Sequence, residues 1–157
     1  MKMTNLQAAI EAVADECIAV RMRLLNRAVT RIYDDALRPF GIKVSQMNIL
    51  VAAGKLGIAR PAEVCKRLHL EASTLSRNVE RMVARGWLEV VSDEDGRAQP
   101  FRLSRKGREL LRRAIPAWKR AQEDVRAMLG DATVRSIGRA AGRLTAAHRP
   151  HQLGENE

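Results

Sequence analysis

The sequence predicts a mostly α-helical protein with a small β wing: a winged helix-turn-helix flanked by N-terminal and C-terminal helices. Three features of the 157-residue chain support this fold class. Apolar residues recur at every third or fourth position over most of the chain, which is the period of an amphipathic helix. Two short segments, 88–90 and 101–103, alternate apolar and polar residues and predict two antiparallel strands. A brief turn at 69–72 separates two helical patterns, as in a helix-turn-helix.

The first helix is expected from Leu6 to Leu37. Its apolar positions keep the helical spacing throughout. Pro39 and Gly41 end it, because proline lacks the backbone donor that a helix needs and glycine favours a turn. This helix is longer than one small core can cover. We therefore expect residues 1–40 to pack against a partner chain.

A second helix is expected from residue 46 to about residue 53. Ser45 is a favourable N-cap, because its hydroxyl can accept a hydrogen bond from a free amide of the first turn. Gly54 and Gly57 are expected to end this helix. Ile58 is expected to lie in a short strand or a connector.

Two further helices form the predicted helix-turn-helix. Pro61 opens the first of them, since proline is tolerated in a first helical turn. The second has the sequence EASTLSRNVERMVARGW over residues 71–87, and Gly86 closes it where a left-handed residue is wanted. Its expected core positions are Leu75, Val79, Met82 and Val83. Its outward side carries short hydroxyls, an amide and arginines: Ser73, Thr74, Ser76, Arg77, Asn78 and Arg81.

The two predicted strands are joined by the polar stretch SDEDGRAQP, which is longer than a two-residue hairpin turn. Ser104 is expected to cap a helix that starts near Arg105 and is kinked at Pro116. Gly130 breaks this helix. A last helix over about 132–147 and a polar tail complete the chain.

Charge narrows the choice of partner. The chain has 28 Lys and Arg against 18 Asp and Glu, a formal net charge of +10, which predicts attraction to a polyanion. Nucleic acid is the first candidate and an anionic membrane surface the second, but no apolar run has the length of a membrane span. Only 3% of the residues are aromatic, whereas proteins that grip single strands usually stack bases on aromatic rings. Double-stranded DNA is therefore favoured, and we expect no membrane partner.

No pattern indicates an enzyme, a cofactor or a metal. The sequence has no Gly-rich phosphate loop, nucleophile elbow or paired-carboxylate site, and Asp34 and Asp35 are expected to be a charged pair on a helix surface. His148 and His151 are three residues apart, but no His/Cys cluster has zinc spacing. Two cysteines do not make a disulfide framework and no signal peptide is visible, so the expected location is cytoplasmic.

Several motifs resemble the MarR family of bacterial transcription regulators. The helix STLSRNVERMVARGWL, the wing residues Asp95-Gly96-Arg97 and the following RLSRKGREL are similar to the family's DNA-binding region, here residues 45–107. RAVTRIYDDALRPFGIKVSQMNIL resembles the family's first two helices, and AWKRAQEDVRAMLG its long penultimate helix. The resemblance implies a homodimer held together by residues 1–40 and 108–148, with a polar tail at 149–157.

The resemblance also implies that two winged modules bind a palindrome. Hydroxyl, amide and guanidinium groups suit the major groove, where each base pair presents its own pattern of donors and acceptors. We expect Arg77 to contact a base and Arg81 to contact phosphate. The neighbouring polar residues are Ser73, Thr74, Ser76 and Asn78. Arg97 of the wing is expected in the minor groove, oriented by Asp95. The family usually has arginine where Gly96 stands, so one contact is lost or the wing tip is more flexible.

Many relatives bind a phenolic or other aromatic carboxylate between the dimer helices and the winged module, and then release DNA. A ligand-responsive repressor is therefore expected, and Arg21 and Arg23 are candidates for holding a carboxylate. Some relatives sense peroxides through a cysteine of the first helix, but the apolar face of Cys17 favours packing, because a reactive thiol needs exposure. The other alternative is a winged-helix module that binds an acidic protein, since a fold does not fix a function.

Overall fold

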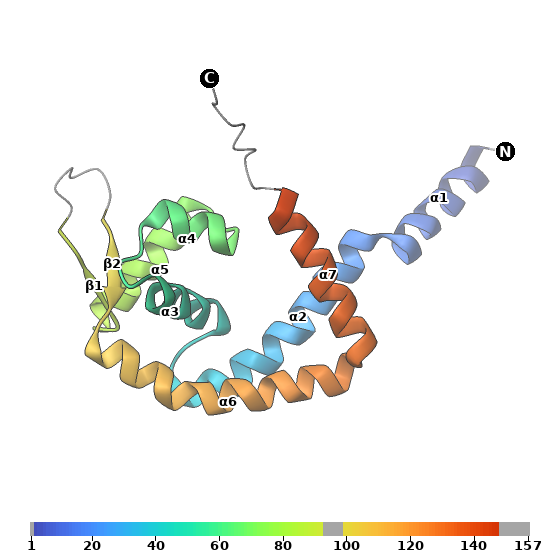
Figure 1. Cartoon of the computed structure of the whole chain (residues 1–157). Helices are drawn as coiled ribbons and strands as arrows, with labels where there is room; N and C mark the ends of the chain where they lie inside the picture. Colours follow the sequence, from blue (N-terminus) through green and yellow to red (C-terminus); the bar gives the residue numbers. More distant parts are fainter. Residues whose placement is uncertain (1, 93–98, 148–157) are drawn as a thin grey trace, which may run out of the picture. The chain divides into compact units, whose positions relative to one another are not determined.

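The computed structural model describes residues 2–92 and 99–147 of the chain (Figure 1). These residues confirm the predicted fold class: a mostly helical chain with a two-stranded antiparallel wing. The elements are α1 (Lys2–Glu16), α2 (Ile18–Leu37), the 3-10 helix η1 (Arg38–Phe40), α3 (Val44–Leu56), α4 (Pro61–Leu68), α5 (Ala72–Ala84), β1 (Leu88–Val90), β2 (Phe101–Leu103), α6 (Arg105–Leu129) and α7 (Asp131–Ala147). The chain divides into two compact units, residues 1–121 and 122–157, and the boundary falls within α6.

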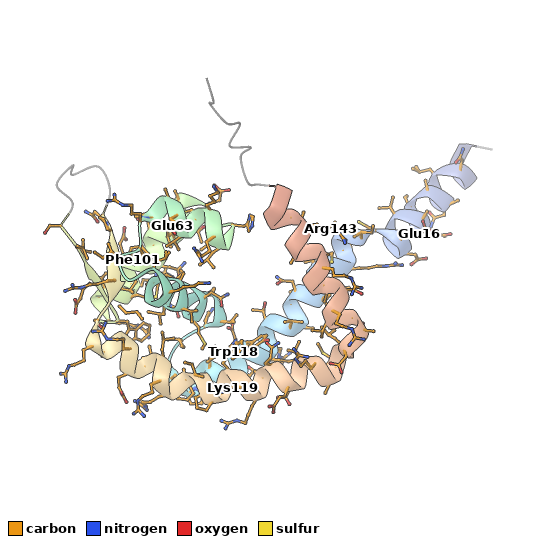
Figure 2. The ribbon with its side chains drawn as sticks, viewed as in Figure 1. Glu16, Glu63, Phe101, Trp118, Lys119 and Arg143 are labelled. Atoms are coloured by element: carbon orange, nitrogen blue, oxygen red, sulfur yellow. The ribbon has the colours of Figure 1, made fainter. Side chains whose placement is uncertain are left out.

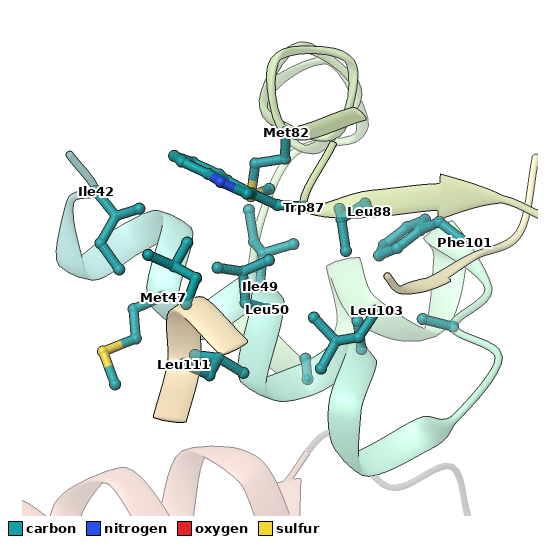
Figure 3. Packing of buried hydrophobic residues seen from close by; sticks show 14 of the residues in the cluster. Ile42, Met47, Ile49, Leu50, Met82, Trp87, Leu88, Phe101, Leu103 and Leu111 are labelled. Carbon is teal, nitrogen blue, oxygen red and sulfur yellow. The ribbon is translucent and has the colours of Figure 1, made fainter. Parts of the chain in front are cut away.

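The core of the first unit lies inside the winged helix-turn-helix. Phe101 of β2 and Leu50 of α3 are completely buried in it. Met82 and Trp87 cover the same cluster from the end of α5, and Leu111 reaches it from α6 (Figure 3). Burial of one such side chain contributes roughly 1.5–3 kcal/mol to folding. This shared cluster holds α5 and the wing on one rigid base.

The wing has the predicted bounds and the predicted antiparallel pairing. Phe101 faces the core, whereas Glu89 and Arg102 face solvent and form a cross-strand ion pair with 3.1 Å between Oε2 and Nε. Ala59 extends the ladder, because it exchanges two backbone hydrogen bonds of 2.8 and 3.0 Å with Phe101. Ile58, which we expected in a short strand or a connector, is 55% exposed beside this bridge.

The predicted single N-terminal helix is in fact two helices, because the chain leaves helical geometry at Cys17 (φ −62°, ψ 108°). Backbone bonds still span the break: the Cys17 amide donates to Val13 O and the Arg21 amide donates to Cys17 O, both at 3.2 Å. The apolar spacing continues through this point without glycine or proline, so periodicity alone does not reveal it. Large apolar side chains on both helices remain exposed, from 47% for Val20 to 75% for Ile18.

The start of α3 differs from the prediction. Ser45 lies inside the first turn, and the N-cap position belongs to Lys43. Two side chains accept backbone amides at this end: Oε1 of Gln46 accepts the Lys43 amide at 3.0 Å, and Oδ1 of Asp34 on α2 accepts the Val44 amide at 2.8 Å. Asp34 is therefore more than the charged surface residue that the sequence indicated, since it ties α2 to the start of α3.

The end of α3 was predicted correctly at one glycine and wrongly at the other. Gly57 ends the helix with φ 73°, a positive value that favours glycine. Gly54 lies inside the helix, where a Cβ atom would be 2.9 Å from Cδ1 of Leu103. The glycine therefore allows β2 to pack closely on α3.

The helix α6 continues through Pro116, the position of the expected kink. Trp118 lies on α6 (Figure 2). In the first unit, its ring stacks on the Tyr33 ring of α2, with 6.4 Å between centroids and 26° between planes. Gly130, with φ 75°, ends α6 as predicted. The following helix starts at Asp131, one residue before the expected position.

Candidate nucleic-acid interface

The helix α5 has the two faces that its sequence predicts. Leu75 and Met82 are 1% and 0% exposed, and Val79 and Val83 pack against the same core. The opposite face is exposed at Ser73, Thr74, Ser76, Arg77 and Arg81, and partly buried at Asn78. The apolar face therefore fixes which side chains α5 presents to solvent.

The outward side chains differ in how they are engaged. The Ser76 hydroxyl donates to Oε1 of Glu80 at 3.0 Å, and the Asn78 amide donates to Thr74 O at 2.9 Å. The guanidinium groups of Arg77 and Arg81 make no hydrogen bond or ion pair with any other described residue. Their guanidinium groups are thus available to an external acceptor, and Arg can bond guanine O6 and N7 in a bidentate manner.

Glu80 is a member of this face that the sequence analysis did not single out. Its exposed carboxylate accepts the Ser76 hydroxyl and lies between the two free arginines in the sequence. A carboxylate repels phosphate but can accept a hydrogen bond from the cytosine amino group. The sequence contains one indication of this contact, because Ser76 and Glu80 are four residues apart and residues at that spacing lie on the same face of a helix.

The turn before α5 places the start of the helix. His69 ends α4 in a left-handed conformation (φ 51°), and the Leu70 amide returns to Cys65 O at 3.0 Å. Glu71 then occupies the N-cap position of α5, and its carbonyl accepts the amide of Leu75 at 3.0 Å. This is the predicted short turn between the two helices of the helix-turn-helix.

The far end of α5 is held by a glycine motif, as predicted. Gly86 has φ 73°, its amide donates to Val83 O at 2.8 Å, and the Trp87 amide donates to Met82 O at 2.9 Å. These two bonds define a Schellman C-cap. The helix therefore stops at a fixed point, and the chain enters β1 with Trp87 already in the core.

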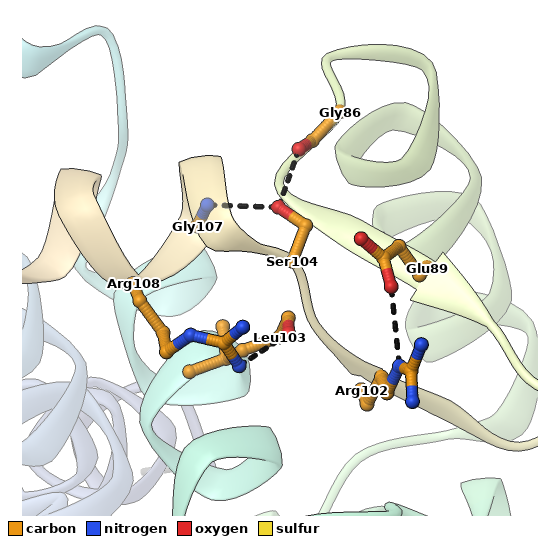
Figure 4. A network of polar contacts seen from close by, with 7 residues as sticks. All are labelled: Gly86, Glu89, Arg102, Leu103, Ser104, Gly107 and Arg108. Atoms are coloured by element: carbon orange, nitrogen blue, oxygen red, sulfur yellow. Dashed lines mark hydrogen bonds and ion pairs between the residues drawn. The ribbon is translucent and has the colours of Figure 1, made fainter.

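Ser104 joins this end of α5 to the start of α6 (Figure 4). Its hydroxyl donates to Gly86 O at 2.6 Å and accepts the Gly107 amide at 2.9 Å. The Ser104 amide also donates to Trp87 O at 3.1 Å. The predicted N-cap at Ser104 is confirmed, and the same residue fixes α5 relative to the wing and α6.

The predicted wing contacts lie outside the described residues. This holds for Arg97, for Asp95 and for the unusual Gly96 between them. It holds also for His148 and His151 in the tail.

An open pocket of about 890 Å³ lies beside α5, between its C-terminal half, the end of α2 and the corner between η1 and α3. Its charged lining residues are Arg31, Asp34, Asp35, Arg38, Lys43, Arg81 and Arg85. Asp35 is paired with Arg38 and, at 3.8 Å, with Arg31. Five cations against two carboxylates leave the pocket positive, which suits an anion. The sequence did not indicate this site, because only the fold joins these segments.

The other candidate ligand residues lie elsewhere. Arg21 donates to the carbonyl of Asp15 across the helix break, and neither Arg21 nor Arg23 lines the pocket beside α5. Cys17 is partly buried at the break, and Cys65 is partly buried on α4; both thiols are free. The structure thus brings neither cysteine into contact with the outward face of α5.

The basic start of α6 is largely engaged within the chain. The Arg108 guanidinium donates to Leu103 O at 2.9 Å (Figure 4), and Arg112 forms two hydrogen bonds of 3.0 and 2.7 Å with Glu109. The hydrogen bond from Arg112 lowers the pKa of the Glu109 carboxyl. All four arginines of this segment are exposed, and Arg105 and Arg113 have no hydrogen bond or ion pair between their side chains and other described residues.

Within the described residues, no group of three or more His, Cys, Asp or Glu side chains is placed to hold a metal ion. No helix of that part of the chain is long and apolar enough to cross a membrane.

Comparison with known proteins gives one family. The MarR family model matches residues 40–98. The uncharacterized HTH-type transcriptional regulator YwoH of Bacillus subtilis is 30% identical over 71 residues, which are 45% of this chain and 52% of that protein. The matched part therefore spans about half the length of the curated relatives.

Solved structures are similar over more of the chain. The M. tuberculosis transcriptional regulator MosR is 34% identical, with a TM-score of 0.70 over 85% of this chain and 98% of that chain. A structure of MosR in complex with DNA gives 32% identity and a TM-score of 0.72, over 85% and 100% of the two chains. A mutant of E. coli MarR in complex with operator DNA has a TM-score of 0.75 over 85% and 96%, and its 17% identity shows a shared fold.

Proposed function

This chain belongs to the MarR family of winged helix-turn-helix transcription regulators, which are not enzymes, and we propose that it is a ligand-responsive repressor that binds a palindromic duplex operator as a homodimer in the cytoplasm. The observation that carries the proposal is the exposed face of α5. It presents two guanidinium groups without partners among the described residues, on a helix whose other face is locked in the core. MosR, which is similar over 85% of this chain, has been solved in complex with DNA.

We assign different roles to the two free arginines of α5. Arg77 lies nearer the start of the helix, and the N-terminal residues of a recognition helix are those that contact base edges. Arg81 lies one turn later and lines the positive pocket, which suits a phosphate contact. Ser73 and Thr74 precede Arg77 and are exposed for further contacts. Arg97 keeps its proposed role in the minor groove, and Asp95 its proposed role of orienting Arg97.

The proposed homodimer is supported by the exposed apolar side chains of α1 and α2. Val13, Ile18 and Leu24 are 66%, 75% and 61% exposed. Contiguous exposed apolar surface on a protein marks a site of interaction. A second copy that supplies the same helices would cover it, as is typical of this family. We propose that residues 1–40 and 108–148 form this interface.

The proposed response to a ligand is supported by the positive pocket beside α5. Its walls come from α2, which we assign to the dimer interface, and from α5, which we assign to DNA. A small aromatic or phenolic acid bound there would favour one arrangement of these two helices, and a ligand shifts an equilibrium by its differential affinity for the two states. A thermal-shift screen with aromatic acids tests this step, because a ligand that binds the native state raises the unfolding temperature.

The DNA proposal is tested by selecting duplexes from a random library and titrating the selected operator and a scrambled duplex. Arg77→Ala is expected to reduce discrimination between them by about 1–3 kcal/mol, the usual worth of one bidentate base contact. Arg81→Ala is expected to weaken both complexes. It should also lower by about 1 the salt slope, which is the magnitude of the slope of log binding constant against log salt concentration. Lys55→Ala, which removes an exposed charge outside α5, the wing and the proposed dimer interface, is the control. If the parent protein selects no sequence at low salt, the proposal is wrong.

Two other functions make different predictions. A winged module that binds an acidic protein would give no sequence-specific mobility shift with DNA flanking its own gene. A redox-sensing regulator would require rapid labelling of Cys17 by a thiol reagent in the native protein. Slow labelling of both Cys17 and Cys65 contradicts that alternative.

A further inference from the structure

We infer that Arg85 is a positioning residue that sets the orientation of α5 relative to α2, and therefore the spacing of half-sites that a dimer recognises. The inference rests on the proposed DNA-binding function. It concerns a contact that joins the end of α5 to the corner between η1 and α3, 44 residues away in the sequence.

The Arg85 guanidinium is held from two sides. Its Nη1 donates to the carbonyl of Gly41 at 2.9 Å, and its Cζ lies 5.0 Å from the centroid of the Trp87 ring. A guanidinium over an aromatic face is attracted by the negative ring face. Trp87 is only 6% exposed and belongs to the core. Arg85 therefore links a fixed ring to a backbone carbonyl of the corner.

The corner itself is attached to α2. Leu37, the last residue of α2, is completely buried, and Ile42 just beyond the corner is 3% exposed. The Asp34 carboxylate accepts the Val44 amide at 2.8 Å. Gly41 turns the chain with φ 69°. These contacts make the corner part of α2 and α3, so the bond from Arg85 connects α5 to α2 through a short and rigid path.

The role of Arg85 differs from that of Arg81, although the two residues are one helical turn apart. The Arg81 guanidinium has no partner among the described residues, so it can meet DNA. Arg85 is engaged by Gly41 and Trp87. Ser104 and the glycine cap hold the end of α5 to the wing and α6 independently of Arg85. Loss of Arg85 therefore leaves α5 folded and packed in the core, but removes its hydrogen bond to the corner that follows α2.

In a dimer, the orientation of α5 relative to α2 sets the distance between the two recognition helices. If the two chains are joined through α2, a change in the angle between α2 and α5 displaces the recognition helix of each chain, so the distance between the two helices changes twice over. The two recognition helices must enter major grooves one helical turn apart, about 34–36 Å. A looser joint would broaden the range of half-site spacings that the dimer tolerates, while each half-site would still be read by Arg77.

The test compares the selected operator with versions in which one base pair is inserted or deleted between the half-sites. The parent protein is expected to discriminate against both altered spacings. In Arg85→Ala, this discrimination should fall about fivefold or more, with the preference for half-site bases and the salt slope unchanged. Arg77→Ala should do the opposite. It should lose the preference for half-site bases but keep the spacing penalty, which is the loss of affinity when one base pair is inserted or deleted between the half-sites. Lys55→Ala, at an exposed position outside α5, the wing and the proposed dimer interface, controls for the loss of one positive charge.

Arg85→Lys keeps the charge but replaces the planar fork by a flexible ammonium. It should lose part of the spacing penalty, and it decides the question if circular dichroism shows that the alanine variant is unfolded. The inference is overturned if the folded alanine variant keeps the parent spacing penalty within about twofold. It is also overturned if the salt slope of that variant falls by about 0.9, which would indicate a lost phosphate contact. If the alanine variant is unfolded, the same two criteria apply to the lysine variant. A parent protein that selects no duplex would instead overturn the proposed function.

Discussion

Replacing Gly107 by alanine would place a methyl group where backbone atoms already lie. A Cβ at this position would be 2.1 Å from Trp87 O and 3.2 Å from Cδ2 of Leu103. The start of α6 would have to move away from the end of α5, and three hydrogen bonds of Ser104 would break. In these bonds its hydroxyl donates to Gly86 O, its hydroxyl accepts the Gly107 amide, and its own amide donates to Trp87 O. At about 1 kcal/mol each, their loss costs about 3 kcal/mol. The higher helix propensity of alanine offsets at most about 1 kcal/mol of this loss.

The net destabilisation of Gly107→Ala is therefore about 2 kcal/mol, which lowers the unfolding temperature of a protein of this size by about 4–8 °C. Gly138→Ala makes the same chemical change inside α7, where a Cβ would meet no atom within 4 Å, and should raise the unfolding temperature. Thermal unfolding followed by far-UV circular dichroism at one fixed protein concentration measures both, because the unfolding temperature of a dimer depends on concentration. A Gly107→Ala protein as stable as the parent would falsify this account of the joint between α5 and α6.

Three further changes test other parts of the structure. Phe101→Ala should cost about 3–5 kcal/mol in urea unfolding, because it empties the centre of the core; a cost below about 1 kcal/mol contradicts the packing. Ile18→Asp should shift the protein towards monomers in sedimentation experiments while the winged module stays folded, and an unchanged dimer would argue against an interface at α2. Glu109→Gln should lower stability in full at pH values above the ordinary carboxyl pKa of 4.5, because Arg112 lowers the pKa of Glu109. The difference should shrink below pH 4.5 and vanish as pH falls through the lowered value; a difference that persists below that value would contradict this.

Local signals in the sequence predicted much of the fold. The strands, the cap at Ser104 and the glycine at the end of α5 were predicted correctly, because each depends on residues a few positions apart. Ser45 was wrongly predicted as a cap, since the acceptor for the first turn of α3 comes from Asp34, ten residues earlier on another helix. Gly54 was wrongly predicted as a helix end, because its need for glycine arises from packing on Leu103. Such requirements follow from the tertiary fold and have no local pattern.

The candidate site divides in the same way. The outward face of α5 was predictable, because burial of Leu75 and Met82 determines where Arg77 and Arg81 must point. The positive pocket was not predictable, since it combines residues from α2, the corner and α5. The role of Arg85 was also hidden, because nothing in the sequence distinguishes it from Arg81, one turn earlier. Only the position of the Gly41 carbonyl makes the difference.

This difference limits what net charge says about DNA binding. The formal charge of +10 counts every guanidinium equally, but several are already engaged by carboxylates or carbonyls: Arg38, Arg85, Arg108 and Arg112. Releasing such a group to meet a phosphate would first break its internal contact, so each contributes less than a free arginine. Since each neutralised phosphate adds about 0.9 to the salt slope, removal of Arg81 should lower the slope, and removal of Arg108 should leave it unchanged. Equal decreases for the two variants would mean that the internal contacts do not hold in the DNA complex.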